Sequence, residues 1–157
     1  MQRILGLDLA SRTTGYALVN EKGKLYKNAF GLIKSETGSI EERYNIFINE
    51  LNKIIAKHKP TLIIVEYTPV RSSFTTNRIL AGFEAIVRYN LFNSKQKYHV
   101  VDVNTIRKCF SLKSKEEAFQ YVISKHKLEN LTFDKHNDIT DAIMCALYGV
   151  KLLKGRE

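Results

Sequence analysis

The segment Thr61–Glu66 contains an uninterrupted apolar run, Leu62–Val65, and ends on a carboxylate. A short strand without polar alternation is typical of a strand that is buried on both faces of a sheet. Such a strand must have other elements packed above and below it. The segment therefore predicts a sheet that is flanked by helices.

Four further segments have the pattern of strands. Three of them, Arg3–Ala10, Thr13–Asn20 and Leu25–Lys34, follow one another, and the turn residues 21–24 separate the second from the third. Because the links between these three are short, we expect them to be antiparallel neighbours. The fifth strand is Tyr98–Val103, which follows Thr61–Glu66 in the chain.

Helices are expected where apolar residues recur at spacings of three and four. The first extends over residues 40–55, after a capping box formed by Ser39 and Glu42 and before Pro60. The others are expected over about Thr75–Phe92, Lys115–Lys125 and Asp138–Leu153. The resulting order predicts an α/β fold, a mixed five-stranded sheet of three antiparallel and then parallel strands, flanked by helices.

Charge and length limit the class of protein. The chain has 157 residues, which suits one domain, and its 25 Lys and Arg against 16 Asp and Glu give a net charge of +9. This surplus indicates a polyanionic partner, most simply nucleic acid. Cys109 and Cys145 are too few for a disulfide framework and indicate a reduced, cytoplasmic protein. No apolar run reaches the roughly 18–20 residues of a membrane span, so we expect no membrane partner.

Four carboxylates occupy positions that are costly for a charge. Asp8 interrupts an apolar strand, Glu66 follows Val65 directly, and Asp138 and Asp141 are three residues apart at the expected start of the last helix. Two carboxylates about 4 Å apart repel by roughly 4 kcal/mol at an effective dielectric of 20. If the four converge, either some of them are protonated or a divalent cation lies among them, and all-oxygen ligands favour Mg²⁺ or Mn²⁺. Two such ions would activate a water molecule and stabilise the leaving oxygen in phosphodiester cleavage.

Each acid also has a structural explanation. Any one of them can be a helix cap or a strand-end residue that faces water, and Asp138 suits the N-terminal end of a helix because of the helix dipole. Two strand-end acids combined with an acid pair at the start of a helix favour the metal site over four separate structural roles.

These residues resemble the motifs of the RuvC family of Holliday-junction resolvases, within the RNase H-like superfamily. The family's first motif, G-x-D-P-G-S-R-x-T-G and an aromatic residue, is matched by Gly6–Tyr16, GLDLASRTTGY. The second, an acid that closes an apolar strand, is matched by Ile64–Glu66, and the last, D-A-A-D-A, by Asp138–Ala142. The resemblance covers essentially the whole chain and implies the RNase H-like form of the fold.

The resemblance implies a homodimer that nicks two strands of a four-way junction with two Mg²⁺ or Mn²⁺ ions per site, and forks are a further candidate substrate. Asp8, Glu66, Asp138 and Asp141 would then be the catalytic, metal-binding acids. In the family, an aromatic residue after the second motif stacks on bases. Phe74, in the segment Tyr67–Thr76, is the candidate here, and its alternative is a side chain folded back over the protein.

Basic residues near strand ends are candidates for contact with DNA phosphates. They are Arg71, Arg78, Lys108, Lys113 and Lys115, with Arg107 beside them. Lys115 matches a basic residue that the family has before the helix expected here over Lys115–Lys125. The alternative for most lysines is a solvated surface. His136 could assist a metal-bound water, or be a solvated residue before the helix.

The sequence departs from the family at several points. Leu9 and Ala10 replace the Pro-Gly of the first motif, only Gly82 remains of the segment L-G-x-x-R-G, and the glycine-rich segment before Lys115 is absent. These departures put junction selectivity in doubt. They suggest a divergent branch of the family; if that branch is the phage-encoded one, the site of action would be the host cytoplasm.

Other functions fit parts of the pattern. A YqgF-like RNA-processing nuclease would have a similar fold and similar acids. A non-catalytic binder of branched DNA would tolerate the loss of an acid, whereas all four are present. Actin-like ATPases open with a similar strand and acid, but they need two such domains, and this chain has room for one.

Overall fold

A five-stranded sheet forms the centre of the computed structural model, which describes residues 1–67 and 73–155. The strands are β1 (Arg3–Asp8), β2 (Thr13–Asn20), β3 (Leu25–Lys34), β4 (Leu62–Tyr67) and β5 (Tyr98–Asp102), in the spatial order β3-β2-β1-β4-β5. β1, β2 and β3 pair antiparallel, while β4 pairs parallel with β1 and with β5. The predicted mixed sheet is confirmed.

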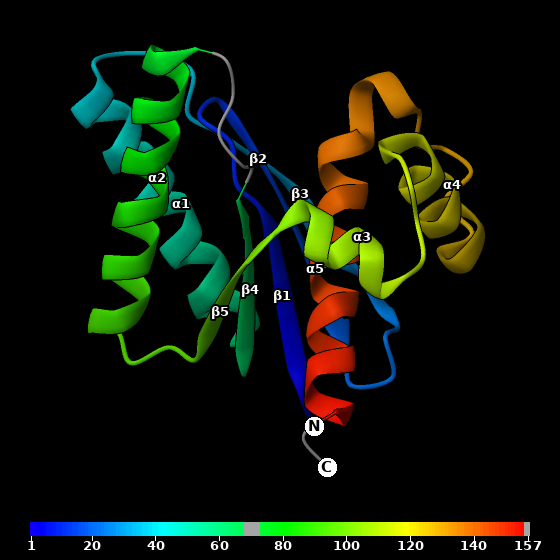
Figure 1. The fold of residues 1–157 in the computed structure, drawn as a ribbon. Coiled ribbons are helices and arrows are strands. Elements are labelled where there is room, and N and C mark those ends of the chain that lie inside the picture. Colours follow the sequence, from blue (N-terminus) through cyan, green and yellow to red (C-terminus); the bar gives the residue numbers. More distant parts are fainter. Residues whose placement is uncertain (68–72, 156–157) are drawn as a thin grey trace.

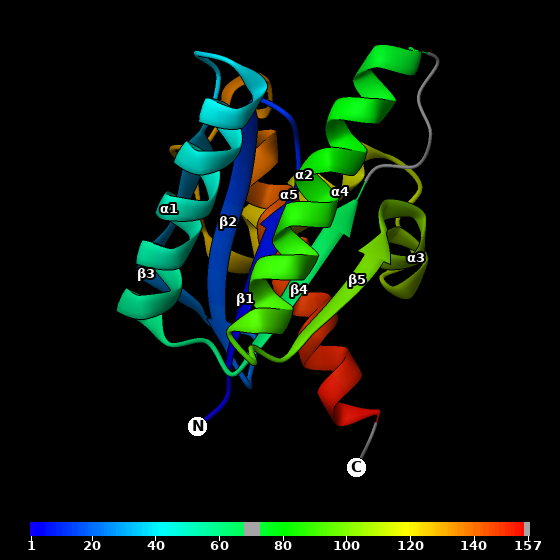
Figure 2. The same cartoon turned by 90° about the vertical axis from the view of Figure 1, so that its left-hand side faces the viewer.

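Helices cover both faces of this sheet. α1 (Ile40–His58) and α2 (Phe74–Asn93) cover one face. The other face carries α3 (Val103–Cys109), α4 (Lys115–His126) and α5 (Phe133–Lys154), with α5 directly on the strands and α4 outside it (Figures 1 and 2). β4 is thus buried on both faces, as its apolar run predicts.

The two faces of the sheet follow from the period of two along each strand. In β1, Ile4 packs in the cluster around α5, whereas Leu5 and Leu7 pack in the cluster under α1 and α2. Side chains of alternate residues point to the same face, so Asp8 points to the side of Ile4. By the same alternation Glu66 points to the side of Ile64, which also faces α5. Both strand-end acids therefore face α5.

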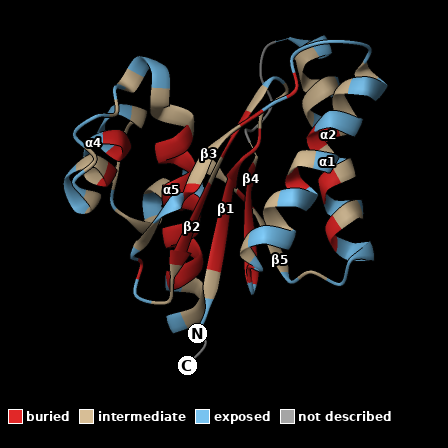
Figure 3. Cartoon of the chain, turned by 180° about the vertical axis from the view of Figure 1, so that it is seen from behind, coloured by how far each residue is buried: buried red, intermediate tan, exposed pale blue. Residues whose placement is uncertain are grey.

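α5 is the most deeply buried helix among the described elements. Every residue from Ile139 to Val150 is buried (Figure 3). Two glycines let its backbone lie directly on the strands. A Cβ added at Gly6 of β1 would lie 2.0 Å from the carbonyl oxygen of Ala142, and one at Gly15 of β2 would lie 2.0 Å from that of Asp138. Only glycine permits so close an approach.

The capping box of Ser39 and Glu42 is confirmed, and α1 ends at His58, before Pro60. Two other expectations are corrected. α5 begins at Phe133, so Asp138 lies in the second turn of the helix and not at its start. This start has no side-chain cap at Thr132; instead Nδ1 of His136 accepts a hydrogen bond from the Thr132 N–H at 2.9 Å. The seven-residue helix α3 was not predicted at all.

Candidate active site

Asp8 and Glu66 are neighbours across the parallel pair β1 and β4. They occupy the same position of the register, Asp8 opposite Glu66, at the C-terminal ends of both strands. Both side chains are buried, with 7% and 4% of the residue surface exposed. Parallel pairing at the centre of the sheet thus brings two carboxylates from distant parts of the sequence side by side.

The other two acids come from α5. Asp141 is 6% exposed and Asp138 is half-buried. The carbonyl of Asp138 lies over Gly15, which pairs with Asp8 in the sheet, so the contact between helix and sheet places this helical turn beside Asp8. The negative charges of Glu66, Asp141 and Asp138 all act on the Asp8 carboxyl. The structure therefore brings the four predicted acids into one region.

A lysine forms an ion pair with one of the acids. Nζ of Lys115, the first residue of α4, lies 3.1 Å from Oδ2 of Asp141. Burial lowers the pKa of Lys115, but its attraction to Asp141, Asp8 and Asp138 outweighs this effect, so the net shift is upward. Lys115 therefore stays charged and offsets part of the negative charge.

The residues identified from the sequence leave out Cys145. It follows Asp141 by one helical turn, and the single S–H of its buried thiol is shared between two acceptors, Oε2 of Glu66 at 3.4 Å and the Leu7 carbonyl at 3.7 Å. The spacing of four from Asp141 was a usable signal, because residues four apart lie on the same face of a helix. Cys145 orients the Glu66 carboxylate from the inside of the protein.

Burial and mutual repulsion raise the pKa of the clustered acids. Burial, followed by the charges of Glu66, Asp141 and Asp138, holds the pKa of Asp8 well above its usual range, and Lys115 opposes this shift. Burial and the Asp141 charge raise the pKa of Glu66 to about 8, against the hydrogen bond from Cys145. Burial also raises the pKa of Asp141, although Lys115 pulls it down. At a pKa of about 8, the Glu66 carboxyl is mostly protonated at neutral pH.

The donor set has the chemistry of a site for hard cations. It consists of carboxylate oxygens, which suit Mg²⁺ or Mn²⁺. Within residues 1–67 and 73–155, no three Asp, Glu, His or Cys side chains already form a group able to hold a metal ion. The contact of Lys115 with Asp141 and that of Cys145 with Glu66 occupy two of the carboxylates. The acids fit the predicted ions in kind: Lys115 contacts Oδ2 of Asp141, and a carboxylate has a second oxygen that can bind an ion.

The predicted DNA contacts are spread over several elements. Phe74 is the first residue of α2 and not part of a loop, and it is 76% exposed, with the Arg78 guanidinium 5.9 Å from its ring centroid. Lys108 lies in α3, and Lys113 lies between α3 and α4. Arg71 lies outside the described residues. Arg107 of α3 acts electrostatically on Glu66 and Asp141, so it is nearer to the acids than the sequence indicated.

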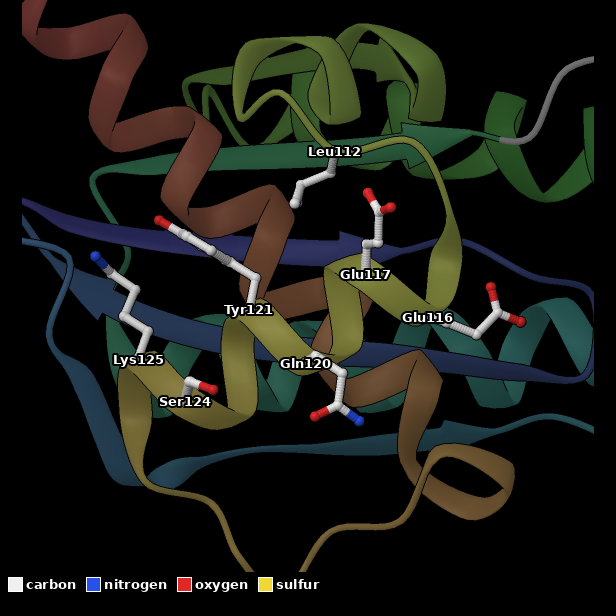
Figure 4. Close-up of a pocket in the computed structure, with 7 residues that line it drawn as sticks. All are labelled: Leu112, Glu116, Glu117, Gln120, Tyr121, Ser124 and Lys125. Atoms are coloured by element: carbon white, nitrogen blue, oxygen red, sulfur yellow. The ribbon is translucent and has the colours of Figure 1, made fainter.

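A surface hollow of about 810 Å³ lies on α4, and none of the four clustered acids lines it (Figure 4). It is lined by Leu112, Glu116, Glu117, Gln120, Tyr121, Ser124 and Lys125. None of the predicted site residues belongs to this lining. No helix in the described part of the chain is both long and apolar enough to cross a membrane.

Comparison with known proteins connects this geometry to a family. The family model described as crossover junction endodeoxyribonuclease RuvC matches residues 4–148. The chain is 33% identical to the crossover junction endodeoxyribonuclease RuvC of Rickettsia typhi, over 91% of this chain and 93% of that protein. It is 36% identical to the RuvC of Alkalilimnicola ehrlichii, but that match spans only 41% of the length of the relative.

A solved structure shares the fold over nearly the whole chain. The Thermus thermophilus RuvC in complex with a Holliday junction substrate superposes with a TM-score of 0.83. The match covers 99% of this chain and 97% of the other, at 16% sequence identity. At this identity the likeness establishes the fold alone.

Proposed function

The chain belongs to the RuvC family of crossover junction endodeoxyribonucleases, and on that premise we propose that it resolves four-way DNA junctions by metal-dependent hydrolysis. The observation that carries the proposal is the cluster of Asp8, Glu66, Asp138 and Asp141 beside Lys115. The Thermus thermophilus relative was solved in complex with a Holliday junction as its substrate, which supports DNA of this shape as the substrate here.

The four acids would hold two Mg²⁺ or Mn²⁺ ions, which activate water and stabilise the leaving oxygen when they are bound. The protein's own part is to fix the ligands. Pairing of β1 with β4 sets Asp8 against Glu66, and the thiol of Cys145 orients the Glu66 carboxylate. The Gly6 and Gly15 contacts set the position of Asp138 and Asp141.

Lys115 is proposed to serve the site through its charge. Its ammonium lies against Asp141 and reduces the repulsion between the carboxylates. Its position as the first residue of α4 keeps the side chain near the acids. If Asp141 held a metal ion, the same ammonium would be placed to contact a DNA phosphate at the site.

Phe74 and Arg78 are proposed to contact the branch point of the junction. An exposed aromatic ring stacks on unpaired bases, and a nearby guanidinium adds attraction to phosphate and to the ring. Both side chains lie at the start of α2, which follows the C-terminal end of β4 and therefore the end of the sheet that carries the acids. Arg71, Lys108 and Lys113 are proposed as further phosphate contacts.

A homodimer is proposed to place two such sites on one junction. The outer face of α2 carries Ala81, Ala85, Tyr89 and Phe92, all exposed, and the two rings are 71% and 72% exposed. A second copy packed against this face would cover both rings, and the alanines would allow close approach of the helices. Two sites in one assembly would make paired nicks.

The decisive experiment replaces Asp8 with Asn. In Mg²⁺, the variant should cut a synthetic four-way junction more than about a hundredfold more slowly, a larger loss than is typical for outer-shell partners of a metal. Binding of the junction should remain. Asp134→Asn is the control, because Asp134 is an exposed acid in the first turn of α5, the helix that carries Asp138 and Asp141. Undiminished cutting by Asp8→Asn would refute the proposal.

Two other functions are tested by the choice of substrate. A panel of four-way junction, fork, duplex and structured RNA, each with Mg²⁺ and with Mn²⁺, separates junction resolution from YqgF-like RNA processing. Cleavage of RNA alone would favour the RNA nuclease. Binding of branched DNA without cleavage of any substrate would favour a non-catalytic binder.

A further inference from the structure

A second hollow lies at the end of the sheet that is remote from the acids. It has a volume of about 430 Å³ and is lined by Met1, Arg3, Leu18, Tyr26, Lys27, Asn28, Ala29, Lys57 and His58. The N-terminus and the end of α1 lie here, opposite the start of α2 (Figures 1 and 2). At about 3.3 Å per residue along β1, Arg3 is about 17 Å from Asp8, so the two sites do not overlap.

The lining of this hollow is cationic and its positive charge is not paired. Arg3 comes from β1, Lys27 from β3, and Lys57 and His58 from α1. Ion pairs among the described residues are formed by Lys53, Arg88 and Lys115, and by none of these four. The neighbouring acid Glu21 instead accepts a hydrogen bond from the backbone N–H of Gln2 at 2.9 Å.

The helix dipole of α1 explains only some of the basic residues that line this hollow. The dipole of α1 favours cations in its last turn, and this accounts for Lys57 and His58. It does not account for Arg3 and Lys27, which lie on two different strands. Nη1 of Arg3 also donates a hydrogen bond to the carbonyl of His58 at 2.9 Å, which fixes the guanidinium at the hollow.

The pKa of His58 reflects the positive charges around it. Burial first, and then the charges of Lys57 and Arg3, lower the pKa of its imidazole. The ring therefore lies among positive charges that the protein itself does not neutralise. An anion bound between these groups would remove the repulsion.

The positive surface extends beyond the hollow. The exposed residues Lys59, Lys95 and Lys97 lie at the same end of the molecule. Gln96 donates a hydrogen bond to the Pro60 carbonyl at 3.1 Å, and the N–H of Ile63 donates to the Lys97 carbonyl at 3.0 Å, so the two loops are neighbours. A surface of this extent suits a chain of phosphates better than a single one.

We propose that this hollow, formed by Arg3, Lys27, Lys57 and His58, binds a backbone phosphate of DNA as a contact separate from the active site. The inference rests on the proposed function in taking DNA as the partner, but it requires none of the four acids. The enzyme would then hold DNA at two places on opposite ends of its sheet.

The first test measures the salt dependence of binding to a four-way junction, with the 157-residue chain in EDTA so that no cleavage occurs. The double variant Lys27→Gln/Lys57→Gln should bind more weakly, and its plot of log K against log salt should be shallower by about 0.9, the contribution of one neutralised phosphate. Arg3 is kept because it holds the His58 carbonyl.

The control is Lys125→Gln/Lys127→Gln. Both lysines are exposed at the end of α4, on the other face of the sheet and outside the hollow, and their replacement removes the same total charge. This variant should keep the wild-type slope. Equal slopes for the two double variants would overturn the proposal, because the effect would then be one of net charge alone.

The second test follows the ring proton of His58 by NMR in the wild-type chain during a pH titration. A short DNA duplex should raise the midpoint, whereas inorganic phosphate at the same phosphate concentration should not. No change with DNA would overturn the proposal, and an equal change with both would assign the hollow to free phosphate instead of DNA. Neither test depends on cleavage, so a catalytically inactive chain would leave both results valid.

Discussion

The Glu66 carboxylate is 4% exposed and lies beside other acids, and its pKa rises to about 8 from an ordinary value near 4.5. Between these values the folded, metal-free protein holds a proton that the unfolded chain releases. The stability gained from this proton is complete below the ordinary pKa and is lost as the pH rises towards 8.

We therefore expect the melting temperature in EDTA to fall between pH 5.5 and pH 8 by more than in the variant Glu66→Gln, which cannot titrate there. One pKa unit corresponds to about 1.4 kcal/mol, and 1 kcal/mol to about 2–4 °C in a chain of this size, so the difference should be several degrees. Differential scanning fluorimetry at both pH values measures it. Identical pH dependence in both proteins would contradict the prediction.

The same protons couple metal binding to pH. Mg²⁺ requires ionised carboxylates, so it competes with protons for Asp8 and Glu66. In the same melting series, saturating Mg²⁺ should thus stabilise the wild-type protein more at pH 8 than at pH 5.5.

At the scale of elements, the contact of α5 with the sheet decides whether the site forms. Gly6→Ala would place a Cβ 2.0 Å from the carbonyl oxygen of Ala142, on the helix backbone. Overpacking typically costs about 1–3 kcal/mol, and the shift of α5 would also displace Asp138 and Asp141. Cleavage should fall together with the melting temperature.

Gly155→Ala is the matched control for this substitution. A Cβ there would meet the Lys151 carbonyl oxygen at 3.5 Å, an ordinary contact, and the backbone φ of −77° suits alanine. Thermal unfolding and junction cleavage are measured for both variants. A Gly6→Ala protein as stable and active as Gly155→Ala would show that α5 does not depend on this approach.

Elements with a clear period or cap, and the antiparallel pairing of the first three strands, were predictable from the sequence, whereas side-chain contacts between distant elements were not. The run Leu62–Val65 predicts β4, and Ser39 with Glu42 predicts the start of α1. The start of α5 was missed because Thr132 has no capping side chain, and α3 because seven residues carry too little periodicity. The pairing of Cys145 with Glu66 joins parts of the chain 79 residues apart, which local patterns do not encode.

At the scale of the whole molecule, the outer face of α2 determines the proposed assembly. Tyr89 and Phe92 would bury about 400–700 Å² across two copies, a large share of the roughly 1,200–2,000 Å² of a stable interface. The double variant Tyr89→Ser/Phe92→Ser should sediment as a monomer, and it should lose paired nicking more than single nicking.

Ile46→Ser is the control for this surface, because Ile46 is an apolar residue, 36% exposed, on α1. It should remain a dimer in sedimentation velocity. A wild-type chain that sediments as a monomer even with junction DNA would contradict the proposed dimer. A double variant that remains dimeric would show that the interface does not lie on the outer face of α2.

The position of α5 also has a consequence during synthesis. Cys145 reaches back to Leu7, 138 residues earlier in the chain, and α5 supplies half of the acids together with the cover for one face of the sheet. A nascent chain that lacks this last helix has Asp8 and Glu66 but neither a closed core nor their partners. The four acids can therefore come together only after α5 has been synthesised, so a chain terminated before Phe133 should be unable to cut DNA.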